Sequence, residues 1–521
     1  MKTICIVGSG PIGATYARIL LETTPDIQVM MFEAGPQLTS TAGENVRNLS
    51  DPTAKAEART KSQGPLAGEH RAALGIPEDT VVEGSFTARQ GTFLLDYGGK
   101  GAVEATDFPA AAASSNVGGQ GVHWTCATPR PADSERVAFV DDSEWGELLD
   151  VAEELLHVRT APFEDSPIAK ALQKVLEREF NDELPDGRGV STLPVAGDPQ
   201  PDGSMRWAGV DAVLGPLIES SHPLSRRFRL RDLTLVREVL HEDGRVHGVK
   251  VEDLRTGETE DVAADAVVVA ADAFRTPQLL WHSGIRPQAL GRYLTEHPVV
   301  VSTVALEGET LREFLTEEQR DTELAHRARH ADPVAAVKRI PFSEPDHPFS
   351  AQIMYSEEPP FRLPEDSPFC GNPWGFVNMG FGLRKRPRVE DGVIFDDELK
   401  DYLGFPKMTI RYSLTDIEGA EIEEATRRLR RAGAALGHFV AEPRLMPAGS
   451  SLHYQGTTRL GEEDDGASVA DPWSTVWGFN NLFVGGNGVI PTATSMNPTL
   501  MSVALAVRGA RRLAHSVGVE R

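Results

Sequence analysis

The stretch that decides the fold is Ile4-Cys-Ile-Val-Gly-Ser-Gly-Pro-Ile-Gly13. Its first four residues are apolar and mostly β-branched, which predicts a buried parallel strand, and residues 14–21 continue with a helical pattern. In such a strand–turn–helix unit the three glycines give a tight turn, a close backbone approach to a pyrophosphate, and close helix packing. Free N–H groups at the helix start attract the phosphates. The sequence therefore predicts a dinucleotide site at Gly8, Gly10 and Gly13.

A second predicted strand, residues 27–32, ends at an acidic residue. Glu33 follows it directly, twenty residues after Gly13. An acid at this position accepts hydrogen bonds from a ribose hydroxyl of the cofactor. NAD and FAD both fit the motif up to this point.

The pieces that would complete the cofactor domain are scattered along the chain, which favours FAD. Residues 233–251 read as a hairpin with Asp243-Gly244 at its turn. Residues 265–271 read as another buried strand, and residues 274–283 as a helix. An α/β fold with a discontinuous FAD domain, interrupted by segments of a substrate domain, is the expected layout.

Composition narrows the class of partner and the compartment. The chain has 521 residues, enough for two or more domains, and its formal charge is 52 − 77 = −25. Such acidity argues against nucleic acid and against an anionic membrane surface. Three cysteines are too few for a disulfide framework or a four-cysteine zinc site, and no metal site is expected. No apolar run approaches the roughly 18 residues of a membrane span. With no export signal before the first strand, we expect a cytoplasmic protein.

Several motifs lie at both ends and in the middle of the chain. Besides the Gly8–Gly13 turn and Glu33, they are Asn116-Val-Gly-Gly-Gln-Gly-Val-His-Trp-Thr125, Thr276-Pro-Gln-Leu-Leu-Trp-His-Ser-Gly284, Gly291-Arg-Tyr-Leu-Thr-Glu-His-Pro298, His453-Tyr-Gln-Gly-Thr-Thr-Arg-Leu-Gly461, Gly485-Gly-Asn-Gly-Val-Ile-Pro-Thr492 and Ser495-Met-Asn-Pro-Thr-Leu500. With them the sequence resembles the glucose–methanol–choline oxidoreductase family. The segments 123–129, 404–412 and 478–486 resemble its pyranose oxidase branch in particular.

The resemblance implies a two-part architecture. A Rossmann-like FAD-binding domain would gather residues 1–160, 205–300 and 447–521. A substrate-binding domain of sheet and helices, α+β in type, would span residues 300–446, with 161–204 as a peripheral insertion. Within it, residues 342–366 are rich in Pro, Glu and aromatic residues. That composition predicts irregular structure and suits a lid over a sugar.

The resemblance also assigns cofactor contacts. A loop along the isoalloxazine would contain Ser114, Asn116, Gly118, Gly119 and Gln120. Val236 in the hairpin is a candidate for a backbone contact to the adenine, with an ordinary strand valine as the equal alternative. Further cofactor contacts are expected at Gly486, Asn487 and Thr499. Thr499 would lie at the flavin pyrimidine ring, and the helix that it starts would point its positive end at flavin N1–C2=O.

His123 admits two interpretations. In fungal pyranose oxidases the histidine of a Thr-His-Trp-Thr motif carries FAD covalently, whereas here Gly121 and Val122 precede the histidine. His123 is either the attachment point of FAD, which the changed neighbours weaken, or a ring stacked on the benzenoid edge of the flavin. Thr125 is then a candidate contact for flavin N5 or for the substrate.

Proton transfer is assigned to His453 and Asn497. Oxidising an alcohol on a flavin removes a carbinol hydride, which goes to N5, and a hydroxyl proton, which needs a base with a pKa near the working pH. By resemblance His453 is that base, and the Asn497 amide orients the substrate hydroxyl without adding charge. A buried structural histidine is the alternative for His453. Gln352 is a candidate substrate contact, with an ordinary strand residue as its alternative.

The expected activity is oxidation of a secondary hydroxyl of a pyranose to a ketone. C3 of a sugar or of its C- or O-glycoside is favoured over C2 because the length matches compact bacterial relatives. Electrons would pass to O2, giving hydrogen peroxide, or to a quinone. The alternatives are a pyranose 2-oxidase, an alcohol or choline dehydrogenase of the same family and, from another class, a flavin-binding protein without catalysis. A monomer or small homo-oligomer is expected.

Overall fold

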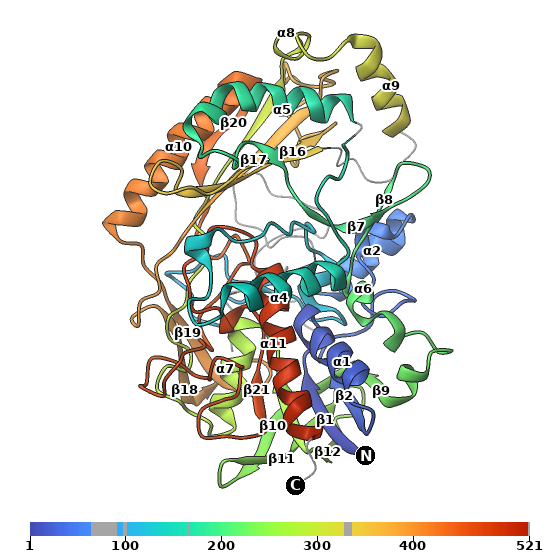
Figure 1. Cartoon of the computed structure of the whole chain (residues 1–521), viewed down its shortest axis with the longest axis vertical. Helices are drawn as coiled ribbons and strands as arrows, with labels where there is room; N and C mark the ends of the chain where they lie inside the picture. Colours follow the sequence, from blue (N-terminus) through green and yellow to red (C-terminus); the bar gives the residue numbers. More distant parts are fainter. Residues whose placement is uncertain (64–90, 97–101, 165, 328–335, 519–521) are drawn as a thin grey trace.

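The computed structural model describes residues 1–63, 91–96, 102–164, 166–327 and 336–518, and the chain forms two layered regions (Figure 1). The lower region in that view is built on a five-stranded parallel sheet in the order β21-β13-β1-β2-β9. Its strands are β1 (Lys2–Val7), β2 (Ile27–Phe32), β9 (Phe228–Arg231), β13 (Ala266–Val269) and β21 (Leu482–Val484). The predicted first two strands and the late return to this sheet are thus present.

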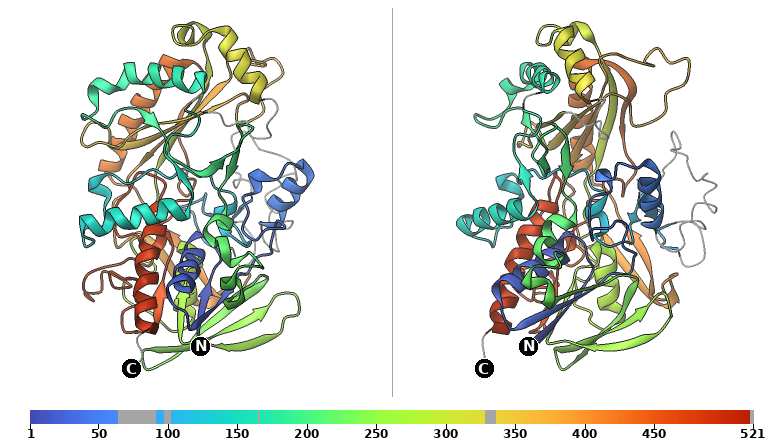
Figure 2. Two further views of the ribbon diagram at one scale, coloured as in Figure 1. Left: turned by 45° about the vertical axis from the view of Figure 1, so that its right-hand side comes forward. Right: turned by 90° about the vertical axis from the view of Figure 1, so that its right-hand side faces the viewer.

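Apolar runs fill the centre of this sheet. Ile4, Ile6 and all of β13 are buried, as expected for parallel strands that are covered on both faces. Helices α1 (Pro11–Thr23), α11 (Thr499–Gly518) and α4 (Asp142–Leu155) lie side by side on this sheet (Figures 1 and 2). The predicted hairpin is part of a three-stranded antiparallel sheet formed by β10 (Thr234–Glu242), β11 (Arg245–Asp253) and β12 (Thr259–Ala263). Helix α7 (Asp272–His282) follows β13.

The upper region is a six-stranded antiparallel sheet in the order β20-β14-β17-β16-β15-β6. Two helices, α5 (Pro167–Phe180) and α10 (Asp416–Leu436), pack together and cover one face of it. The strands are β6 (Ser191–Thr192), β14 (Val299–Leu306), β15 (Ala336–Ile340), β16 (Phe349–Ser356), β17 (Phe376–Leu383) and β20 (Gly437–Leu445). The other face is turned toward the lower region, because Gln352 of β16 contacts Asn497 there.

Two predicted segments differ from expectation. Residues 161–204 are not peripheral, because α5 buries Ile168, Leu172 and Val175 in the core of the upper sheet and β6 pairs with β15. The periodicity of α5 alone could not tell which sheet it would cover. Residues 342–366 are not irregular throughout, since they contain β16, whose alternate residues are buried. Its proline-rich flanks, not the strand, gave the segment its composition.

The hairpin of β18 (Gly392–Lys400) and β19 (Pro406–Arg411) lies apart from the upper sheet. It packs beside α7, in an apolar cluster with Phe93, Phe274 and Tyr454 (Figure 1). Part of the predicted substrate domain, residues 392–411, therefore builds the wall of the lower region.

Shorter elements complete the chain. The first strand and the end of α11 meet at the foot of the lower region, where the Lys2 ammonium donates to the Val517 carbonyl (Figure 1). Two helices, α8 (Gly308–Leu311) and α9 (Glu317–Arg327), lie at the top of the upper region (Figure 1). The other elements are α2 (Pro52–Lys61), β3 (Phe93–Leu94), β4 (Ala112–Ala113), β5 (Val158–Arg159), β7 (Val195–Pro199), β8 (Met205–Trp207) and α6 (Val210–Leu214).

Candidate active site

The three glycines of the first turn have different surroundings. Gly8 has φ +97°, and a Cβ added there would lie 2.3 Å from the Ala270 carbonyl oxygen. A Cβ on Gly13 would lie 2.1 Å from the Gly8 oxygen, so Gly13 lets α1 pack on the turn. A Cβ on Gly10 would meet nothing nearer than the Gly118 oxygen at 4.0 Å, because Gly10 faces a cavity. These positions match the three roles predicted for the glycines.

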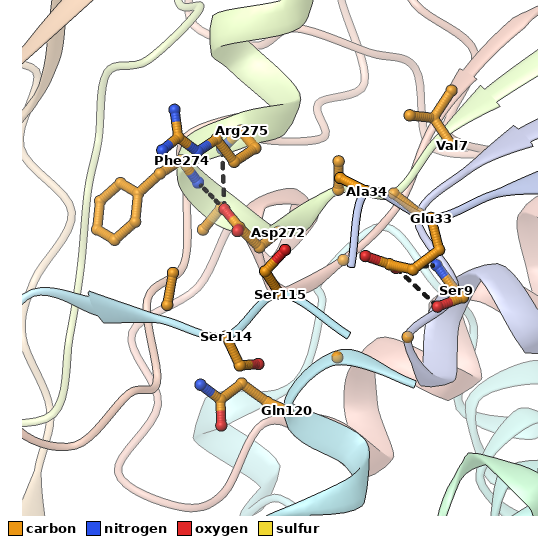
Figure 3. A pocket seen from close by; sticks show the side chains of 18 of the residues that line it. Val7, Ser9, Glu33, Ala34, Ser114, Ser115, Gln120, Asp272, Phe274 and Arg275 are labelled. Carbon is orange, nitrogen blue, oxygen red and sulfur yellow. Dashed lines mark hydrogen bonds between the residues drawn. The ribbon is translucent and has the colours of Figure 1, made fainter. Parts of the chain in front are cut away.

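An elongated cavity runs from this turn along the ends of β1, β2 and β13 (Figure 3). Most of the predicted cofactor residues line it: Gly8, Gly10, Glu33, Ser114, Gly119, Gln120, Val236, Gly486, Asn487 and Thr499. The first turn of α1 opens into the cavity, since Gly10 caps the helix without a side-chain hydrogen bond and Pro11 follows it. The N–H groups at this helix end therefore suit a pyrophosphate.

Glu33 is fixed at the edge of the cavity by its neighbours. Its carboxylate accepts hydrogen bonds from the Ser9 hydroxyl at 2.7 Å and from the Gly35 N–H at 2.9 Å (Figure 3). Burial raises the pKa of Glu33, and the nearby Asp272 carboxylate raises it further. The acid is thus held where a ribose hydroxyl would reach it, as the motif predicts.

Sequence reasoning missed a second set of wall residues around α7. Asp272 has φ +77° and caps α7 by accepting the Phe274 N–H at 2.6 Å and the Arg275 N–H at 2.8 Å (Figure 3). The Arg275 guanidinium donates to Asp401 at 2.6 Å. Tyr402, Leu403 and Phe405, which connect β18 to β19, complete this apolar end. An acid directly after the predicted strand 265–271 was the available signal for Asp272.

The wall residues fit FAD by their unmet hydrogen bonds and by their apolar lining. Ser114 Oγ and Gln120 Nε2 are buried without a protein partner among the described residues, and both residues line the cavity (Figure 3). Leu235, Val236, Leu279 and Leu403 give an apolar slot at the α7 end. Polar groups in the middle, a phosphate-binding turn and an apolar end are what an elongated dinucleotide requires.

Four predicted residues lie behind or beside the wall. Asn116 is buried and donates from its amide to the Val117 carbonyl at 2.9 Å, and the Gly118 N–H donates to Ser9 Oγ at 2.9 Å. Both residues shape the loop and do not line the cavity. The His123 ring packs on Gly91, its Nε2 is buried without a partner in the described chain, and burial and the charge of Arg59 lower its pKa to about 4. Thr125 is exposed.

The predicted proton-handling pair forms one cluster with the predicted substrate residue. The Asn497 amide nitrogen lies 3.3 Å from His453 Nε2. Gln352 of β16, a strand of the upper sheet, donates to the Asn497 carbonyl oxygen. Leu452, Tyr454 and Thr499, which lie close to this pair in the chain, line the cavity, whereas His453, Asn497 and Gln352 are not among the lining residues. The cluster therefore lies beside the cavity, under the strand β16 that carries Gln352.

A buried histidine supports His453 from behind. His297 Nδ1 lies 3.0 Å from His453 Nδ1, and His297 Nε2 lies 2.9 Å from Thr494 Oγ1. Burial lowers the pKa of His297 to about 3, so the ring is neutral at working pH. The segment 291–298 contributes to the family resemblance, but the sequence did not predict a role for His297. Its position just before β14 was the available signal.

Two buried carboxylates hold the loops that carry the pair. Glu296 accepts the N–H groups of Gly449 at 3.0 Å and Ser451 at 2.7 Å, just ahead of His453. Glu135 accepts the Ser495 N–H at 2.6 Å and the Ser495 hydroxyl at 2.7 Å, just ahead of Asn497. Each loop is therefore fixed by hydrogen bonds to a charged acceptor, which are stronger than neutral ones.

Comparison with known proteins places the chain in a family. Residues 130–299 and 393–506 match two family models, both described as GMC oxidoreductase. The chain is 44% identical to a C-glycoside 3-oxidase of Microbacterium trichothecenolyticum, over 99% of this chain and 96% of that one. The chain belongs to the GMC oxidoreductase family. It is an FAD-dependent oxidoreductase of the kind that acts on CH–OH groups.

Further relatives and structures agree with this placement. A C-glycoside 3-oxidase of Arthrobacter globiformis is 42% identical over 99% of this chain and 95% of its own. A pyranose 2-oxidase of Tricholoma matsutake is 32% identical over 99% and 94%. The crystal structure of pyridoxine 4-oxidase from Mesorbium loti superposes with a TM-score of 0.65 at 18% identity, covering 99% of both chains. This last likeness concerns the fold alone.

Among the helices of the described residues, none combines the length and the apolar character that a membrane crossing requires.

Proposed function

We propose that this GMC oxidoreductase oxidises the C3 hydroxyl of the pyranose ring of a C- or O-glycoside to a ketone. The observation that carries the proposal is the hydrogen-bonded cluster of His453, Asn497 and Gln352, whose neighbours in the chain line the cavity. The relatives at 44% and 42% identity are C-glycoside 3-oxidases, whereas the pyranose 2-oxidase stands at 32%. This ranking favours C3 over C2.

His453 Nε2 takes the hydroxyl proton in this proposal. Bound FAD supplies the two-electron acceptor. Gln352 donates to the Asn497 carbonyl oxygen, which turns the Asn497 NH2 group toward His453 Nε2. A substrate hydroxyl placed between the imidazole and the amide can give its proton to the first while accepting a hydrogen bond from the second.

His297 sets the tautomer of His453. A base at Nε2 must hold its own proton on Nδ1, and His297 Nδ1 lies 3.0 Å from that atom. A neutral His297 accepts this proton's hydrogen bond and carries its own proton on Nε2, toward Thr494 Oγ1 and the Gln455 amide. The structure places the Gln455 amide nitrogen 3.0 Å from His297 Nε2, so this tautomer requires the amide group to be turned so that its oxygen faces His297.

The start of α11 adds an electrostatic contribution. Thr499 is its first residue and lines the cavity, and the Ser502 N–H closes the first turn onto the Pro498 carbonyl at 2.9 Å. The N–H groups ahead of that turn carry partial positive charge. Negative charge that develops nearby during the reaction is therefore stabilised.

For the mode of FAD attachment we infer non-covalent binding. His123 is not among the residues that line the cavity, and its ring rests on Gly91. Precipitating the yellow protein with acid should release the colour into the supernatant. Colour that stays with the pellet, and is lost in His123→Ala, would establish a covalent link instead.

The proposal is tested by anaerobic mixing of the holoenzyme with a panel of free sugars, C-glycosides and O-glycosides. Glycosides should bleach the flavin, and NMR of the product should show a 3-keto pyranose. Bleaching with free glucose alone and a 2-keto product would establish a pyranose 2-oxidase. Reoxidation with O2, followed by a peroxide assay, and reoxidation with a quinone then identify the electron acceptor.

Three further outcomes would contradict parts of the proposal. Bleaching by choline but by no sugar would establish a choline dehydrogenase. An unchanged rate of flavin reduction in His453→Ala would remove the proton-handling role from that residue. A flavin that no alcohol reduces would leave only cofactor binding.

A further inference from the structure

Arg339 lies in the same row of the upper sheet as Gln352. In the antiparallel pairing of β15 with β16, Arg339 is directly opposite Gln352. Directly opposite residues of an antiparallel pair project to the same face of the sheet. Because Gln352 donates to Asn497, that face is the one turned toward the catalytic pair.

The neighbours of Arg339 along β15 confirm which face of the sheet its side chain projects from. The Lys338 ammonium donates to Gln173 of α5 at 3.0 Å, and Ile340 packs in the core beneath α5 and α10. These alternate residues therefore face the helices. Val337, two residues before Arg339, packs instead against Ala127, close to the predicted flavin-contact segment.

The Arg339 guanidinium is short of partners for a half-buried cation. Its Nε donates to Ser191 Oγ at 3.1 Å, and in the described part of the chain its two terminal nitrogens have neither a hydrogen-bond acceptor nor a carboxylate partner. Burial and the nearby Arg188 both lower the pKa of Arg339. Buried or half-buried charges are normally paired, because leaving water without a counter-charge is costly.

The strand on the other side of Gln352 leaves room on this face. Gly380 of β17 pairs with Gln352, and it has no side chain to fill the space beside the amide. The row therefore presents a hydrogen-bonding amide, a bare backbone segment and an unbalanced cation. Neighbouring strands are about 4.8 Å apart, so Arg339 stands one strand further from Asn497 than Gln352 does.

We propose that Arg339 binds an anionic group, a carboxylate or an ionised phenol, that the glycoside substrate carries outside the carbon being oxidised. The inference rests on the proposed function, which places the pyranose at His453. The protein has a net charge of −25 and the sugar ring is neutral, so a half-buried cation without a carboxylate partner in the described chain, in the row of Gln352, favours an anionic partner from the substrate. The planar fork of arginine matches a carboxylate in geometry.

The test measures binding separately from turnover. Calorimetric titrations use the anaerobically reduced holoenzyme, which cannot accept a further hydride. One pair of ligands is 4-carboxyphenyl and 4-carbamoylphenyl β-glucoside, which differ in aglycone charge. A second pair is methyl β-glucuronide and methyl β-glucoside, which differ in charge at C6. The pair that shows the charge preference identifies the source of the anion.

The proposal predicts that the charged member of one pair binds about tenfold more tightly than its neutral partner, a difference of about 1.4 kcal/mol. Added salt should reduce this preference, because a half-exposed ion pair is screened. Equal affinities within both pairs would overturn the proposal. This comparison needs no variant, so it does not depend on how a substitution folds.

Variants then locate the preference. Arg339→Gln should abolish it while leaving the affinity for the neutral glycosides unchanged, and Arg339→Lys should retain part of it. Arg229→Gln is the matched control, because Arg229 is an exposed arginine on β9 of the lower sheet and its loss changes the net charge equally. A preference that survives in Arg339→Gln, or disappears in Arg229→Gln, would contradict the assignment.

Flavin reduction by the oxidised enzyme distinguishes this inference from the proposed function. If the aryl glucosides leave the flavin oxidised but the charge preference is measured, the anion site stands and the proposed function fails. If the glucosides reduce the flavin and no charge preference is measured, the proposed function stands and the anion site fails.

Discussion

The FAD cavity and the catalytic cluster are built in opposite ways. The cavity is shaped mainly by backbone, at a turn whose glycines are at most five residues apart and at strand ends of one parallel sheet. The cluster is made of side chains from four distant segments, which bring His297, Gln352, His453 and Asn497 together. In a site shaped by backbone, an added methyl group displaces either the chain or the cofactor. A site made of side chains can lose its catalytic group while the fold is retained.

The largest effect is expected at Gly13. Gly13→Ala would place a Cβ 2.1 Å from the Gly8 oxygen, so the turn and α1 must separate. We expect a loss of stability of about 3 kcal/mol or more and a colourless protein. Thermal unfolding and the ratio of flavin to protein absorbance measure both. An equally stable, fully yellow variant would contradict the close packing.

Gly10→Ala is the matched control for that substitution. The added methyl group enters the cavity and meets no protein atom nearer than 4.0 Å. The apoprotein should therefore unfold at the same temperature as the unsubstituted apoprotein while its affinity for FAD falls. Unfolding at a lower temperature without FAD would show that Gly10 is also needed by the fold.

His453→Ala tests the side-chain site. Removing a general base lowers a rate by about 10²- to 10⁴-fold. We expect a fall of that size in anaerobic flavin reduction, with unchanged FAD content and melting temperature, because the loops are fixed by Glu296 and Glu135 and not by the imidazole. Loss of FAD in this variant would show that the two regions are not separable.

His297 is expected to have a smaller effect, of about 10- to 100-fold, as is typical of residues that orient a functional histidine. His297→Leu removes the acceptor for His453 Nδ1, whereas the amide oxygen of His297→Asn replaces it. The apparent pKa in the pH profile of flavin reduction should shift in the leucine variant and return toward the wild-type value in the asparagine variant. Identical profiles for the two variants would indicate a merely structural role.

The smallest effect is a dependence of stability on pH. Burial lowers the pKa of His297 to about 3, below its value in the unfolded chain. The unfolded state therefore binds more protons between roughly pH 6.5 and 3, so this contribution is complete above pH 6.5 and is lost as the pH falls. Between pH 7 and 5 the wild type should lose about 1 to 2 kcal/mol more than His297→Asn, by denaturant titration. Equal losses in both proteins would contradict a neutral buried His297.

The sequence predicts the backbone site more completely than the side-chain site. Gly8–Gly13 and Glu33 are predicted from the residues themselves because a local pattern dictates a local shape, whereas Val236 is predicted by resemblance. His453, Asn497 and Gln352 are found by resemblance, and the structure brings them together. His297, Asp272 and Tyr402 were missed, because their roles depend on how a late hairpin and a strand start pack against distant segments. The same dependence on packing explains why α5 and β16 were misjudged.

The central claim is that the hydride leaves C3 of a pyranose at the meeting point of these two regions. Its most direct test is stopped-flow flavin reduction with one glucoside deuterated at C3 and, separately, at C2. The account predicts slower reduction with the C3-deuterated glucoside and an unchanged rate with the C2-deuterated one. Slower reduction with the C2-deuterated glucoside alone would contradict it.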